Sequence, residues 1–178
     1  MRIGSLYVVA LGTAALASDA ILSTLEKIQH ATVDIKDTMA RYQGGYANAV
    51  PIVTRAVRLH QIITTATSPR AGVGEILAAR SADANARVLD VARSLTKDVG
   101  DAVDASIEMK SKLSEIPAAS RVALVALRQL HGASSRFVQA YGSRASVENR
   151  EAARALGQTV ESHLVRGIKA YEGASWSS

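Results

Sequence analysis

The sequence predicts an all-α fold, an antiparallel bundle of about five helices that follows an N-terminal secretion signal. Apolar residues recur at alternating gaps of three and four, which is the spacing of one helix face. No stretch alternates with the period of two that is typical of a half-buried strand. Glycine or proline separates successive helical segments. At 178 residues the chain is long enough to bury a sizeable core as one domain.

The first bundle helix is expected from Asp19 to Tyr42. Glycine can adopt the left-handed conformation that ends a helix, so Gly44-Gly45 should stop it and turn the chain back. Its buried stripe should be made of the residues spaced by three and four along this segment. These are Ile21, Leu25, Ile28, Thr32, Ile35, Met39 and Tyr42.

A second helix is expected from Tyr46 to about Thr67, with Pro69 as the residue that interrupts it. The short connection makes the first two helices antiparallel neighbours. Residues 73–80 would form either a short helix or a loop. A long third helix should begin near Ala82, and Gly100 inside it, at a cost of ~1 kcal/mol relative to alanine, allows a kink or a split.

The fourth helix is expected from Pro117, a residue suited to a first helical turn, to Tyr141. The fifth should open with Ser146 as N-cap and end before Gly173. A short polar tail with Trp176 would follow.

The N-terminus has the pattern of a secretory signal peptide. Met1-Arg2 gives a charged start, residues 3–16 form an apolar run, and Ala15-Leu16-Ala17 is a small-x-small cleavage site. A membrane anchor is the alternative, but about 14 apolar residues fall short of the ~20 that a spanning helix needs. We therefore expect a signal peptide at residues 1–17, a bundle domain at 18–173 and a tail at 174–178, with the product released outside the cell.

Composition excludes several classes of function. Without cysteine, neither a disulfide framework nor a thiolate metal site is available. Removal of Arg2 with the signal peptide leaves 20 basic and 16 acidic side chains, a net charge of +4. The arginines are spread over several outer faces without interleaved aromatics, which argues against nucleic-acid binding. Attraction to an acidic wall or to anionic lipid is compatible with this charge.

Neither catalysis nor metal binding is indicated. No Gly-x-Ser-x-Gly or His-Glu-x-x-His motif occurs, and the acidic residues fall on the outer faces of the expected helices. We therefore expect a protein that is not an enzyme, with no cofactor and no metal site.

The order of these features resembles the hydrophobic surface-binding protein A family, which comprises secreted fungal proteins grouped with the cell-wall galactomannoproteins. The resemblance rests on the leader, the pattern Ala-Ile-x-x-x-Leu-x-x-Ile at residues 20–28, the Tyr42-Gln43-Gly44-Gly45 helix end, the alanine-rich middle, and the closing residues 166–173. It implies a helical bundle that binds hydrophobic surfaces, with fatty acids enclosed in an apolar cavity and cell-wall polysaccharide as a further partner. This chain is basic, whereas the family tends to be acidic, which leaves the surface or ligand open.

A few polar residues are expected on the inner faces, where one or more would receive the carboxylate of a bound fatty acid. These head-group candidates are His60, Thr64, Thr32, Ser106 and Ser134. Alternatively, the hydroxyls bond to carbonyls one turn earlier on their own helix, and His60 is a core histidine with satisfied hydrogen bonds.

Apolar inner positions would line the path of an acyl chain. The lining candidates are Ile28, Ile35, Met39, Val53, Leu95, Val99, Leu130, Phe137, Val160, Leu164 and Gly167. The missing side chain of Gly167 would either leave room for a ligand or allow close helix contact.

The sequence therefore predicts a secreted protein that binds hydrophobic surfaces, fatty acids or both. Burial of about 14 methylenes is worth ~11 kcal/mol gross, against ~1 to 3 for one head-group hydrogen bond, so the tail should set affinity and the polar anchor orientation. Two alternatives remain open: a structural or antigenic cell-wall component with a filled interior, and a secreted effector that acts through protein contacts on its outer faces.

Overall fold

The structure, a computed structural model, describes residues 5–67, 82–142 and 147–172, with side chains from residues 21, 86 and 150 onward in the three ranges. They form five helices: α1 (Ser5–Ala40), α2 (Tyr46–Thr67), α3 (Ala82–Leu113), α4 (Ala119–Gly142) and α5 (Val147–Glu172). The predicted all-α bundle is confirmed. Residues 73–80, the N-cap at Ser146, and the stop and tail from Gly173 lie outside the described residues.

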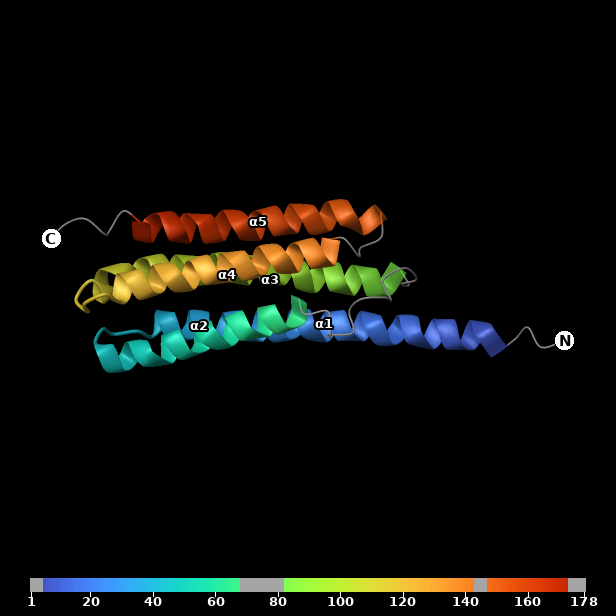
Figure 1. The fold of residues 1–178 in the computed structure, drawn as a ribbon, viewed down its shortest axis with the longest axis horizontal. Helices are drawn as coiled ribbons and strands as arrows, with labels where there is room; N and C mark the ends of the chain where they lie inside the picture. The colour runs from blue at the N-terminus through green and yellow to red at the C-terminus, as the bar shows by residue number, and fades with distance from the viewer. Residues whose placement is uncertain (1–4, 68–81, 143–146, 173–178) are drawn as a thin grey trace.

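Figure 1 shows the five helices lying lengthwise beside one another, and the contacts between them close into a ring. Helices α1, α3 and α5 run in one direction, and α2 and α4 run in the other. Around the ring the order is α1, α3, α5, α4 and α2, and α2 packs back on α1. The consecutive helices α3 and α4 barely touch, because α5 lies between them in the ring. A five-membered ring encloses a wider central space than the core of a four-helix bundle.

Two helices begin at a different residue from the expected one. Helix α1 begins at Ser5 instead of Asp19, so residues 5–16 of the apolar run continue into the bundle helix. No proline interrupts that stretch, and alanine and leucine favour helix. In Figure 1 the first part of α1 extends past the other helices. Helix α4 begins at Ala119 instead of Pro117, because Ala118 takes a left-handed φ of 62°.

Glycines mark both a turn and a close helix contact. Gly44 and Gly45 have φ values of 99° and 83°, which explains why α1 ends and the chain reverses there. Helix α3 runs unbroken through Gly100. A Cβ on Gly100 would lie only 3.0 Å from the ring of His163 on α5, so the glycine permits close packing of α3 and α5 rather than a kink.

The core lies inside the ring, and all five helices contribute to it. Val88 of α3 and Tyr171 of α5 are the most deeply buried large side chains among the described residues. The stripe predicted for the first helix is buried throughout, from Ile21 to Tyr42. None of the described helices has an apolar stretch long enough to cross a membrane.

Candidate functional site

An apolar cavity of about 180 Å³ runs along the inside of the ring. On α3 its lining extends from Leu89 to Met109, which at 1.5 Å per residue corresponds to ~30 Å. One leaflet of acyl chains in a bilayer is about 15 Å thick, half of the ~30 Å hydrocarbon core. The cavity is thus long enough for an acyl chain but narrow for its length. For comparison, an engineered cavity of ~150 Å³ admits benzene.

Alanine keeps this interior open. The lining includes alanines from four of the helices, at positions where a larger residue would fill the centre. They are Ala56, Ala92, Ala102, Ala123, Ala126 and Ala153. The predicted alanine-rich interior is therefore hollow, and the alternative of a solidly filled bundle is not what the structure has.

Most of the predicted lining residues face this space. Nine of the eleven do so: Ile28, Ile35, Met39, Leu95, Val99, Leu130, Phe137, Val160 and Leu164. The expected inward placement is wrong for Val53, whose side chain is 44% exposed on the outer face of α2. Gly167 does not line the cavity either. A Cβ there would lie 3.2 Å from Val103 and 3.4 Å from Leu127, so the glycine serves close helix contact.

The hydroxyls inside the cavity differ in whether they are already bonded. Thr32 donates to the carbonyl of Ile28 and Thr96 to that of Ala92, each at a distance of 2.8 Å, so these two hydroxyls bond to their own helices. Among the hydrogen bonds of the described residues, none involves the hydroxyl of Ser134, which also lines the cavity. Ser134 is therefore a lining serine whose hydroxyl is available to a ligand.

Ser106 is bonded across the ring. The Tyr171 hydroxyl donates to the Ser106 carbonyl at a distance of 2.6 Å, and the Ser106 hydroxyl lies 3.3 Å from the Tyr171 hydroxyl oxygen. Burial raises the pKa of Tyr171 above its usual value, and the hydrogen bond with Ser106 opposes this shift. The pair joins α3 to α5 and occupies the hydroxyl that was a head-group candidate.

The two remaining head-group candidates, His60 and Thr64, do not line the cavity. Thr64 is exposed, so its expected inward placement is wrong. His60 is half-buried, and its Nδ1 is buried without a hydrogen-bond partner among the described atoms. The inner face of α2 is instead formed by Ile52, Ala56, Leu59 and Ile63. Val53, His60 and Thr64 are each one position away from these, which turns them about 100° around the helix.

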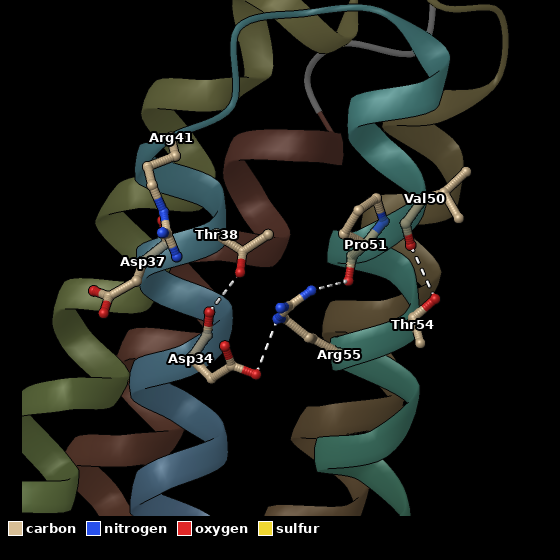
Figure 2. A network of polar contacts seen from close by, with 8 residues as sticks. All are labelled: Asp34, Asp37, Thr38, Arg41, Val50, Pro51, Thr54 and Arg55. Carbon is tan, nitrogen blue, oxygen red and sulfur yellow. Dashed lines mark hydrogen bonds and ion pairs between the residues drawn. The ribbon is translucent and has the colours of Figure 1, made fainter.

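Helix α2 is held to α1 by an ion pair (Figure 2). Arg55 Nε donates to Asp34 Oδ2 over 2.9 Å, and the Arg55 Nη1 atom lies 3.4 Å from the carbonyl of Pro51 on its own helix. The outer side of α2 includes several exposed apolar residues, with Tyr46, Val50 and Val57 74%, 47% and 49% exposed. Helix α2 thus has apolar residues facing both the cavity and the solvent.

A second cavity of about 210 Å³ lies between α4 and α5, and we call it the polar cavity because charged and amide side chains form part of its lining. Its lining includes His131, Gln139, Arg154, Gln158 and Glu161. Sequence reasoning missed it, because each of these residues lies on the flank of a helix and only the pairing of α4 with α5 brings them together. No group of three or more metal-ligating side chains occurs in the described part of the chain.

Comparison with known proteins agrees with this architecture. A crystal structure of Afmp4p in complex with palmitic acid superposes with a TM-score of 0.78 at 18% identity, and covers 86% of this chain and 99% of the other. Ligand-binding domain 1 of the Penicillium marneffei MP1 protein, complexed with arachidonic acids, superposes with a TM-score of 0.68 at 18% identity. The match covers 87% of this chain and 98% of the domain. Ligand-binding domain 2 of that protein, complexed with multiple arachidonic acids, superposes with a TM-score of 0.66 at 17% identity. The match covers 87% of this chain and 96% of the domain.

No curated protein matches the chain in sequence. The family model of hydrophobic surface binding protein A matches residues 18–142, well over half of the chain, and the resemblance inferred from the sequence is thereby confirmed. This protein belongs to the hydrophobic surface binding protein A family.

Proposed function

We propose that this protein binds a long-chain fatty acid in the cavity inside its helical ring, without catalysing a reaction. The observation that carries the proposal is the cavity itself, which is apolar along ~30 Å of helix α3 and is kept open by alanines. The structural neighbours that hold palmitic or arachidonic acid have the same fold. Burial of the acyl chain would supply most of the affinity.

The cavity is narrow, so an acyl chain would widen the ring as it binds. A substitution that fills the centre should prevent this. Ala126→Phe adds a benzene-sized ring at a lining position, in a space only slightly larger than the ~150 Å³ that benzene occupies in an engineered cavity. We expect native mass spectrometry after incubation with palmitic acid to show at least tenfold less retained ligand than in the wild type.

Ala155→Phe is the matched control, because Ala155 is exposed on α5 and the same ring there points away from the cavity. It should retain palmitic acid as the wild type does. If Ala126→Phe folds and retains as much palmitic acid as the control, the acyl chain lies elsewhere and the proposal is wrong.

Secretion is part of the proposal. The family match begins at residue 18, where the predicted signal peptide ends, and the first part of α1 extends beyond the other helices. Removal of residues 1–17 would leave the buried stripe intact, since it starts at Ile21. N-terminal sequencing of protein released by a fungal host should give Ser18 or a residue next to it.

A second candidate function, adsorption to hydrophobic solids, is favoured by a specific surface feature. Tyr46, Val50, Val53 and Val57 form an exposed apolar stripe on α2, and Val122 and Val125 are 47% exposed on the neighbouring α4. Exposed apolar residues grouped in this way are typical of interaction surfaces.

Val53→Glu/Val57→Glu should reduce adsorption to polystyrene beads severalfold and leave palmitic-acid binding unchanged. The control, Gln61→Glu/Thr65→Glu, adds the same charge at exposed polar positions of α2. Equal losses in both variants would assign the effect to charge alone and count against this stripe.

A further inference from the structure

The apolar cavity and the polar cavity share one wall. Ser134 and Val138 of α4, and Gly157, Val160 and Leu164 of α5, line both. The two spaces therefore lie on opposite sides of the α4–α5 contact, and a ligand that crosses this contact would have its two ends in different surroundings.

The two helices pack closely at Gly157. A Cβ at this position would lie 2.4 Å from Cγ1 of Val138, so only glycine permits this approach of the two helices. Ser134 precedes Val138 by one helical turn and so lies on the same face of α4. Its hydroxyl is thus placed beside the point where the two cavities meet.

The polar side of the wall has hydrogen-bond donors that are not used. His131 Nε2 is buried and has no hydrogen-bond partner, and it lies 3.6 Å from Glu161 Oε1, which is too long for a hydrogen bond. Arg154 is exposed and makes no ion pair or hydrogen bond within the part of the chain that the structure describes. A buried polar atom without a hydrogen-bond partner is costly, so the site gains when a ligand supplies that partner.

The charges around this site are close to balanced. Arg154 and Glu161 are its charged lining residues, and the Glu161 side chain is 57% exposed, so it can turn toward solvent. An anion beside His131 would replace the long contact with Glu161 and face the Arg154 guanidinium. Arginine is well suited to a carboxylate, because its planar donors match the two oxygens.

We propose that the space between α4 and α5 is the carboxylate subsite for a fatty acid whose tail lies in the apolar cavity, with Ser134 at the crossing point and His131 and Arg154 as the receiving donors. This inference rests on the proposed function and names the class of head group that the protein recognises. It follows because an ionised carboxylate left inside an apolar cavity is strongly disfavoured. Two of the hydroxyls there, those of Thr32 and Thr96, are already bonded to their own helices.

The test compares palmitic acid with the alcohol of the same chain length, both titrated into the protein without residues 1–17. The wild type should bind the acid more tightly. His131→Ala/Arg154→Ala should lower the affinity for the acid about tenfold, the loss of one charge-assisted pair, and change that for the alcohol less than about twofold. Ser134→Ala should give a smaller loss in the same direction.

His30→Ala/Arg121→Ala is the matched control, because it removes the same residue types from exposed positions on α1 and α4. Arg154→Glu alone, at an exposed position, serves as a second variant if the double variant does not fold, and it should also reduce the preference for the acid. A variant that keeps the full preference for the acid, or that loses acid and alcohol equally, overturns the subsite while the cavity proposal stands. If the wild type binds neither ligand, the proposed function fails and the subsite with it.

Discussion

Helix α2 and the α3–α5 pair are both walls of the same cavity, but they are held in different ways. Between α3 and α5, Gly100 and Gly167 allow close contact, and two polar links cross the interface. Lys110 Nζ donates to the Ala170 carbonyl at a distance of 2.5 Å, and Arg166 forms an ion pair with Asp104 at 2.7 Å. These contacts add to the buried bond between Tyr171 and Ser106, so we expect α3–α5 to be the rigid side of the ring.

Helix α2 has no comparable set of polar contacts. Among the described residues, the Arg55–Asp34 pair is its polar link to another helix, and its packing against α1 and α4 is less extensive than that between α1 and α3. Otherwise α2 is attached to the bundle by burial of the apolar stripe that includes Ile52 and Leu59. Since a narrow cavity must widen to take an acyl chain, we expect the ring to widen by displacement of α2, with α3–α5 as the fixed frame.

The largest expected difference between the two walls comes from adding the same ring to each. Gly167→Phe should lower the free energy of unfolding by about 3 kcal/mol or more, because its Cβ already meets Val103 and Leu127 and the ring must push the helices apart. Val53→Phe, on the exposed face of α2, should change it by less than about 0.5 kcal/mol. Urea unfolding followed by circular dichroism measures both. Similar losses at the two positions would remove the distinction between a rigid and a mobile wall.

An intermediate effect is expected for the buried bond in the rigid wall. Tyr171→Phe removes the hydroxyl that donates to the Ser106 carbonyl over 2.6 Å and should cost ~1 to 2 kcal/mol of unfolding free energy. The pKa of Tyr171 is raised in the folded state. Its contribution to the free energy of unfolding should therefore be complete below the unfolded-state pKa of about 10, and should be lost as the pH rises beyond that value.

Tyr171→Phe should remove this part of the alkaline loss of stability. The control is Tyr46→Phe, whose ring is 74% exposed on α2. Stability measured from pH 8 to 11 for both variants separates the two tyrosines, and an unchanged alkaline slope in Tyr171→Phe would contradict the assignment.

The sequence predicted which segments are helical but not how they are arranged in the ring. Helical spacing identifies an apolar face, yet it does not say which helix that face meets, so the separation of α3 from α4 by α5 could not be foreseen. For α1 a single stripe left no ambiguity, and Ile28 and Ile35 were placed correctly. For α2, two apolar stripes lie one position apart, so spacing alone does not distinguish the inner stripe from the exposed one that includes Val53.

The candidate site divides in the same way. Apolar lining positions followed from periodicity, because they are the inner faces of α1, α3, α4 and α5. The polar cavity could not be predicted, because His131 and Arg154 lie on different helices and neither is on an inner stripe. The role of Gly157 could not be predicted either, because the clash that a Cβ there would make with Val138 depends on the three-dimensional pairing of α4 and α5.

A small effect on stability is expected at the link between α1 and α2 (Figure 2). The Arg55 and Asp34 side chains are 34% and 47% exposed, so solvent screens the pair and Arg55→Ala should cost only ~0.2 to 1 kcal/mol. The same change should speed the uptake of palmitic acid severalfold in stopped-flow measurements, because α2 then moves outward without breaking an ion pair.

In 1 M salt, where the Debye length falls to ~3 Å, the wild type should approach the uptake rate of the Arg55→Ala variant. Arg58→Ala, at an exposed position of α2 with no ion pair among the described residues, is the control and should leave the rate unchanged. If Arg55→Ala and Arg58→Ala take up the ligand at the wild-type rate, α2 is not the wall that yields.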